Sequence, residues 1–215
     1  MRGAALLLAF VLGAAPAAAT QAPPVTREQA LANITNRDVA TRRQAAAWLG
    51  DLGAMADAPA LLTALRDEDE MVRALAERSL WQVWSRSGDA QIDALFQQGV
   101  DQMQRGDAEV AIQTFTTIIQ KKPEFAEGWN KRATIYYLVG EYEKSLQDCD
   151  EVIRRNPSHF GALAGYGQIY VQLQKPERAL DYFERALQVN PNLRSVEAAV
   201  GELKRLILEK RRGTI

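Results

Sequence analysis

The fold is decided by residues 123–157, PEFAEGWNKRATIYYLVGEYEKSLQDCDEVIRRNP. This stretch begins and ends with a proline, and Pro191 follows after a further 34 residues. Proline ends α-helices, and a fixed period of 34 residues is typical of stacked helical hairpins. The spacing therefore predicts a helix-pair repeat, a kind of structure that forms open solenoids and binds other proteins.

Small and aromatic residues recur at the same period. Small residues are expected where two helices approach closely, and aromatic residues where neighbouring pairs meet. Two glycines, Gly106 and Gly140, are placed to end the first helix of their repeats in the left-handed conformation, whereas Pro176 is placed to open a second helix. The recurring columns are Gly99, Ala133 and Gly167; Ala111, Ser145 and Ala179; Phe115, Cys149 and Phe183; and Gln102, Tyr136 and Tyr170.

These columns resemble the tetratricopeptide repeat (TPR) family over residues 92–193, in three copies without insertions. Beyond them, apolar residues follow a helical stripe in residues 194–210, at Val196, Val200, Leu203 and Ile207. This stripe predicts a helix that caps the last repeat.

Residues 26–86 carry a different period, of 31 residues, at which Asp38 meets Asp69 and Arg42 meets Arg73. The pattern resembles two short HEAT repeats, a family in which such Asp and Arg residues commonly link adjacent repeats. We expect these hairpins to dock on the first TPR-like pair through a short join at residues 87–91. The predicted fold is an all-α, right-handed α-solenoid of two HEAT-like hairpins, three TPR hairpins and one capping helix.

The first residues are typical of an export signal. Arg2 precedes an apolar run at residues 4–13, and small residues follow at 17–19. We expect a signal peptide at residues 1–19 that is cleaved near Ala19, with Ala22 as a second choice, and a short leader at residues 20–25. The alternative is an uncleaved membrane anchor. Cleavage would make the protein periplasmic or secreted.

The composition of the chain excludes several kinds of binding and catalytic site. The 215 residues carry a net charge of −1 and contain one cysteine and one histidine. A nucleic-acid binder would show a strongly basic face, and neither an intrachain disulfide nor a His/Cys metal cluster can form. His159 and Cys149 have no nucleophile or acid partner at a suggestive spacing, and Cys149 is predicted to be a buried, inert thiol. We expect no catalytic site, cofactor or metal.

Two tryptophans three residues apart, Trp81 and Trp84, share one helix face. They could form an exposed aromatic contact for a partner, because tryptophan is enriched at binding hot spots. The alternative is packing against the neighbouring repeat.

The TPR resemblance implies that the first helix of each pair lines a concave groove. By that resemblance the partner-binding positions are Phe96, Val100, Met103, Asn130, Lys131, Thr134, Tyr137, Ala164, Gln168 and Val171. One TPR subfamily clamps acidic C-terminal tails with Lys, Asn and Arg, but the corresponding positions here hold Phe96, Val100, Gly161 and Gly165. We therefore expect the groove to accept a helix or extended segment of another protein through apolar anchors. The alternative is that the first half of the chain partly fills the groove.

The sequence thus predicts a non-catalytic scaffold or adaptor of the bacterial cell envelope. Its partner would be another protein, with no nucleic acid and no small-molecule substrate, and it would touch a membrane only through partners or an uncleaved signal. A periplasmic chaperone-like assembly factor is the alternative. An enzyme of the HEAT-like chromophore-attachment group would need a reactive cysteine or an acid/base pair, which the sequence does not show.

Overall fold

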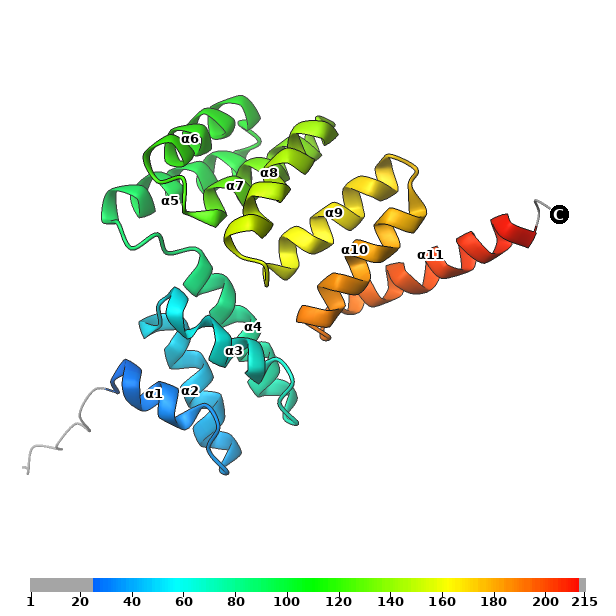
Figure 1. The fold of residues 1–215 in the computed structure, drawn as a ribbon. Helices are drawn as coiled ribbons and strands as arrows, with labels where there is room; N and C mark the ends of the chain where they lie inside the picture. The colour runs from blue at the N-terminus through cyan, green and yellow to red at the C-terminus, as the bar shows by residue number, and fades with distance from the viewer. Residues whose placement is uncertain (1–24, 213–215) are drawn as a thin grey trace, which may run out of the picture.

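The computed structural model describes residues 25–212, which form eleven α-helices and one short 3-10 helix (Figure 1). The predicted all-helical solenoid of stacked hairpins is confirmed, whereas the predicted signal peptide lies outside the described residues. In chain order the elements are α1 (Arg27–Asn33), α2 (Val39–Leu52), η1 (Met55–Asp57), α3 (Ala58–Ala64), α4 (Glu70–Trp84), α5 (Ala90–Arg105), α6 (Ala108–Lys121), α7 (Ala126–Leu138), α8 (Tyr142–Arg155), α9 (Phe160–Gln172), α10 (Pro176–Val189) and α11 (Arg194–Arg212).

The 34-residue period corresponds to the hairpins α5/α6, α7/α8 and α9/α10. The second helix of each hairpin ends two residues before Pro123, Pro157 or Pro191, as predicted from the sequence. The connection between α4 and α5 comprises residues 85–89 and lies two positions before the predicted 87–91, because Asp89 already caps α5 by accepting hydrogen bonds from the N–H groups of Gln91 and Ile92.

The small-residue columns allow the helices to approach closely. A Cβ atom at Gly99 or Gly167 would overlap the ring of Phe115 or Phe183 on the paired helix. In the second repeat the Oγ of Ser145 crosses the same space and donates to the backbone oxygen of Ala133 at 2.7 Å.

The turn inside each TPR hairpin needs one residue in the left-handed conformation. Gly106 and Gly140 supply it, with φ of 82° and 80°. The third turn places Gln174 in the same region, with φ of 55°, shortly before Pro176 opens α10 as predicted.

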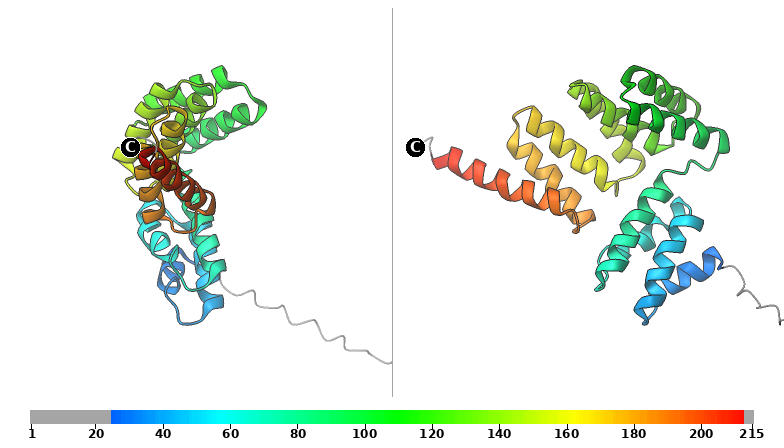
Figure 2. Two further views of the ribbon diagram at one scale, coloured as in Figure 1. Left: turned by 90° about the vertical axis from the view of Figure 1, so that its right-hand side faces the viewer. Right: turned by 180° about the vertical axis from the view of Figure 1, so that it is seen from behind.

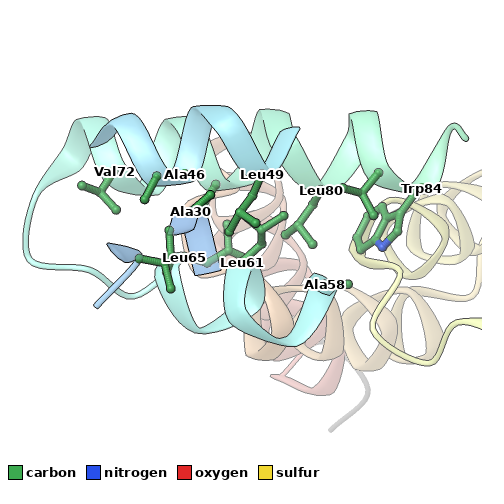
Figure 3. Close-up of a cluster of buried hydrophobic side chains, with 14 of the residues drawn as sticks. Ala30, Ala46, Leu49, Ala58, Leu61, Leu65, Val72, Leu80 and Trp84 are labelled. Carbon is green, nitrogen blue, oxygen red and sulfur yellow. The ribbon is translucent and has the colours of Figure 1, made fainter. Parts of the chain in front are cut away.

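The N-terminal helices form two hairpins, α1/α2 and α3/α4, around an aliphatic core (Figure 3). Leu49, Leu61 and Leu80 are completely buried in this core. Its far end is closed by Phe160 of α9, so the two halves of the chain share one hydrophobic cluster.

The N-terminal hairpins do not stack on the first TPR hairpin, which corrects our expectation. They lie beside the ends of the later repeats, against the turns that follow α8 and α10 (Figures 1 and 2). Phe160, the first residue of α9, directly follows the first of these turns, and Val189 and Leu193 flank the second.

Polar contacts fix this arrangement at the α10–α11 turn. Asn190 Nδ2 donates to the carboxylate of Glu77 at 3.0 Å, and Asn192 Nδ2 donates to the backbone oxygen of Leu65 at 2.8 Å. Both asparagines belong to the turn around Pro191, so the end of the third repeat is the main site at which the N-terminal half contacts the repeats.

The recurring arginines of the 31-residue period make equivalent contacts. Arg42 donates to the backbone oxygens of the loop before α2 and, at 2.7 and 2.9 Å, to the carboxylate of Asp67 in the next hairpin. Arg73 donates to the corresponding loop oxygens before α4 and, at 2.9 Å, to Asn192. The α10–α11 turn therefore takes the place that a third N-terminal hairpin would occupy.

Helix α11 buries Val196, Val200, Leu203 and Ile207 and covers α10, so the predicted capping helix is confirmed. Figure 2 shows its C-terminal part projecting away from the body of the molecule. Within residues 25–212, every helix is too short or too polar to span a bilayer.

Candidate partner-binding site

A recess of about 100 Å³ lies between α7 and α9, the first helices of the second and third TPR hairpins. The polar side chains around it are Asn130, Thr134 and Tyr137 from α7 and Gln168 from α9. Its floor is made of small residues, including Gly165, Ala133 and Cys149. The recess is therefore a shallow, mainly uncharged hollow on the face where the sequence predicted a binding groove.

The structure brings only part of the predicted site together. Asn130, Thr134, Tyr137 and Gln168 border the recess, and Gln168 and Thr134 are exposed. Val171 is 43% exposed one turn further along α9, and Leu138, one turn beyond Thr134 on α7, is 70% exposed; neither lines the recess itself.

The predicted residues of α5 lie elsewhere. Phe96 is 6% exposed and packs edge-on against Phe115 and Phe125 in the core of the first repeat. Val100 and Met103 are half-buried against the same core. Phe96 therefore stabilises the first hairpin and is not available as an apolar anchor, and the recess does not extend to α5.

The two remaining predicted residues have structural partners. Ala164 is half-buried against the core of the third repeat. Lys131 forms an ion pair with Glu127 at 3.7 Å and lies over the ring of Trp81, 5.8 Å from the ring centroid. A Cβ at Gly161 would overlap that same indole. The N-terminal half thus closes one end of the groove and leaves the recess itself open.

Trp81 and Trp84 pack as core residues. Trp84 is 4% exposed and stacks on His159, with ring centroids 4.6 Å apart, and Trp81 meets His159 and Phe160 edge-on. The packing alternative is therefore the correct one.

A buried polar pair beside these rings was missed by the sequence analysis. Glu127 and His159 are both completely buried, and Glu127 Oε1 lies 2.6 Å from His159 Nε2. His159 Nδ1 accepts a hydrogen bond from the N–H of Ala162 and caps α9, so the ring proton lies on Nε2 and points at the carboxylate. The sequence did contain a sign of this pair. At the 34-residue period His159 corresponds to Phe125 and Leu193, which are apolar, so a buried position was to be expected for the histidine.

The Glu127 carboxylate of this pair is held ionised inside the protein. Burial by itself would raise the pKa of Glu127, but His159, Lys131 and Asn130 hold that pKa at about 2. With no exposed surface on either partner, the pair lies out of reach of a substrate and serves to join the second and third repeats.

Cys149 is buried, as predicted, although it forms part of the floor of the recess. Burial raises the pKa of its thiol to about 12, which keeps the reactive thiolate scarce at neutral pH.

The arrangement of three helical hairpins with a concave recess defines a helical-repeat protein. Residues 93–124, 126–159 and 163–193 each match a model of the tetratricopeptide repeat, so the three TPR repeats are confirmed. The matched ranges agree with the period of 34 and with the hairpins α5/α6, α7/α8 and α9/α10.

Curated relatives align with the same region. A TPR repeat-containing protein of Rhizobium etli is 33% identical over 120 residues, which are 56% of this chain and 59% of the relative. Tetratricopeptide repeat protein 12 of mouse is 27% identical over 103 residues, which are 48% of this chain and 15% of that protein. The chain therefore spans less than two thirds of the length of either relative.

Solved structures show the same TPR fold. The second TPR domain of human RPAP3, in complex with the HSP70 peptide SGPTIEEVD, is 25% identical with a TM-score of 0.50, over 53% of this chain and 95% of that one. The Sgt2 TPR domain from Aspergillus fumigatus has a TM-score of 0.55 at 22% identity, over 59% of this chain and 85% of that one.

Proposed function

We propose that this protein is an adaptor of the bacterial cell envelope that holds a helix or extended segment of another protein in the groove between α7 and α9. TPR repeats are protein-interaction scaffolds, and the RPAP3 domain with the same fold carries a bound peptide. The observation that carries the proposal is the recess between α7 and α9, with its small-residue floor; Val171 and Leu138, further along the same two helices, are exposed apolar side chains.

The groove is not suited to the acidic tail of the peptide bound to RPAP3. Clamp positions that would need Lys and Asn in the first repeat hold the buried Phe96 and the half-buried Val100. Gly161 and Gly165 stand where basic residues would be needed. Small residues instead leave room for an apolar side chain of the partner, which favours an anchor in a pocket over charge recognition.

Binding of a partner in the groove can be tested with a substitution that fills the recess. A photo-crosslinking residue at Gln168 would capture the envelope protein that occupies the recess, which mass spectrometry then identifies. Gly165→Phe should abolish the crosslink because the new ring occupies the floor, whereas Gln147→Phe on the exposed side of α8 should leave it intact. An unchanged crosslink in Gly165→Phe would show that the partner does not enter the recess.

Dissociation kinetics of the captured partner separate the adaptor from the chaperone-like alternative. An adaptor should remain bound to one folded protein, whereas an assembly factor should release clients within minutes and bind several of them. N-terminal sequencing of protein purified from the envelope tests export, with a mature chain that begins after Ala19 as the expected result.

We also propose that the two N-terminal hairpins are HEAT-like. The equivalent contacts of Arg42 and Arg73, each reaching the next structural unit, support this assignment.

A further inference from the structure

A buried chain of hydrogen bonds behind the partner-binding recess fixes the orientation of the Asn130 amide. His159 Nε2 donates to Glu127 Oε1 at 2.6 Å, and Asn130 Nδ2 donates to Glu127 Oε2 at 3.0 Å. Because Glu127 is ionised, with a pKa of about 2, its carboxylate only accepts hydrogen bonds. The NH2 end of the Asn130 amide must therefore face Glu127, and the amide cannot turn round.

The oxygen end of this amide belongs to the recess. Asn130 is 8% exposed and lines the recess. Its Oδ1 accepts no hydrogen bond from residues 25–212, and this oxygen remains accessible to solvent. A side chain that is more than nine-tenths buried thus presents one unpaired acceptor to the recess. Since polar atoms of buried side chains are nearly always paired, this acceptor indicates a hydrogen-bond donor on the ligand.

Thr134 presents a second acceptor, one turn further along α7. Its hydroxyl donates to the backbone oxygen of Asn130 at 2.9 Å, so its hydrogen is used and only its lone pairs remain. Thr134 is exposed at the rim of the recess. The other polar groups of the rim, the Gln168 amide and the Tyr137 hydroxyl, can rotate to suit a donor or an acceptor. The two fixed atoms therefore decide the preference of the recess, and both require a donor.

We propose that the recess receives an extended segment of the partner, whose backbone N–H groups donate to Asn130 Oδ1 and Thr134 Oγ1. This assignment rests on the proposed function of the recess and names the kind of segment that enters it. In a helix the N–H groups beyond the first turn are bonded internally, so an extended segment alone offers free N–H groups beside an anchoring side chain. The recess of about 100 Å³, with Gly165 and Ala133 in its floor, has room for one small apolar side chain.

Glu127 and His159 are positioning residues in this arrangement. Both are completely buried, so neither touches the partner. Their role is to hold the oxygen of Asn130 toward the recess, and it can be tested through the kind of compound that the recess prefers.

Two dipeptide mimics test the requirement for N–H groups. N-acetylvaline methylamide has two N–H groups, whereas its doubly N-methylated analogue keeps the carbonyls and the side chain but has none. Each is titrated into isotope-labelled protein, and the amide signal of Gln168 is followed by NMR. We expect N-acetylvaline methylamide to bind at least about fivefold more tightly, the effect of one ordinary hydrogen bond. Gly165→Phe should abolish binding by filling the recess, and Gln147→Phe on the exposed side of α8 should not.

Reversing the Asn130 amide gives a sharper test. In Glu127→Gln the Nε2–H of His159 still requires an oxygen, because Nδ1 of the same ring accepts from the N–H of Ala162. The new NH2 group must then face Asn130, whose amide turns its oxygen toward residue 127 and its NH2 group into the recess. The preference should reverse, with the analogue that lacks N–H groups bound at least as tightly as N-acetylvaline methylamide. Loss of packing alone would weaken both compounds alike and leave the preference unchanged.

A further variant avoids the buried pair. Thr134→Val removes an acceptor at the exposed rim and should reduce the preference for N-acetylvaline methylamide, whereas Thr134→Ser should keep it. The wild type and this variant decide the question even where Glu127→Gln does not fold.

The recess does not recognise backbone N–H groups if neither compound binds saturably, if both bind the wild type equally, or if folded Glu127→Gln keeps the wild-type preference. Those results would leave the photo-crosslink at Gln168 intact and the proposed function standing. An unchanged crosslink in Gly165→Phe would instead remove the proposed function, and the extended segment with it.

Discussion

At the residue scale, single backbone conformations decide how tightly the hairpins turn. Gly106 and Gly140 adopt positive φ without strain, but Gln174 carries a side chain in the same conformation, at φ of 55°. The third hairpin therefore contains a local strain that the first two avoid.

Gln174→Gly should stabilise the protein by about 0.5–1 kcal/mol, because glycine adopts the left-handed region without a Cβ clash. Urea unfolding followed by circular dichroism measures the change. Gln168→Gly is the control, since this exposed residue lies inside α9, where glycine should cost about 1 kcal/mol. A loss of stability in both variants would contradict the assignment of strain to Gln174.

Two glycines of α9 should respond in opposite ways to alanine. A Cβ at Gly165 would meet only the sulfur of Cys149, at 4.0 Å, so Gly165→Ala should gain roughly 0.5–1 kcal/mol of helix stability. A Cβ at Gly161 would overlap Trp81, a rigid ring, so Gly161→Ala should destabilise by about 1–3 kcal/mol. Equal Tm shifts of the two variants would show that the N-terminal half does not press on α9.

At the scale of helices and turns, the 34-residue pattern was enough to predict the hairpins and their ends. Its signals are local: Pro157 ends a helix and Gly140 ends another wherever the rest of the chain lies. The position of the N-terminal half against the repeats could not be predicted from such local signals. It depends on the hydrogen bonds that Asn192 makes with Arg73 and with the backbone oxygen of Leu65. These two partners lie 119 and 127 residues from Asn192 in the sequence and follow no period.

The residues of the groove could likewise be predicted only in part from the repeat pattern. The repeat pattern placed Asn130, Thr134 and Tyr137 beside the recess, because these positions face the concave side in any such hairpin. It failed for Phe96, since the pattern does not show that Phe115 and Phe125 surround this ring.

The turn between α8 and α9 depends on the charge of Glu127. Its pKa is about 2 in the folded protein, below the ordinary 4.5, so the stabilisation is complete above pH 4.5 and is lost as the pH falls toward 2. Glu127→Gln should cost about 1–3 kcal/mol at pH 7, and this difference from the wild type should shrink as the pH is lowered through that window. Urea titrations at several pH values measure it, with the exposed Glu109→Gln as control. A difference that is constant from pH 7 to pH 3 would contradict an ionised Glu127.

At the scale of the whole molecule, the chain is a curved array in which the first half returns to the end of the third repeat. The contacts at Asn190 and Asn192 and the shared ring cluster around Phe160 couple hairpins that are distant in sequence. Arrays of repeats normally transmit stability only between neighbours. Here the return contact should make α1–α4 and α7–α11 unfold together.

Asn192→Ala tests this coupling, because it removes the acceptor for Arg73 and the donor to the Leu65 backbone oxygen at one position. We expect the free energy of unfolding to fall by about 1–3 kcal/mol, and amide hydrogen exchange in α1–α4 to become faster than in the wild type. Ser158→Ala is the matched control, because Ser158 occupies the corresponding position in the preceding turn, one period earlier. If exchange in α1–α4 stays at the wild-type rate while α10 and α11 alone lose protection, the N-terminal hairpins are stable without the return contact. In that case the junction between the two halves of the chain would be a flexible joint.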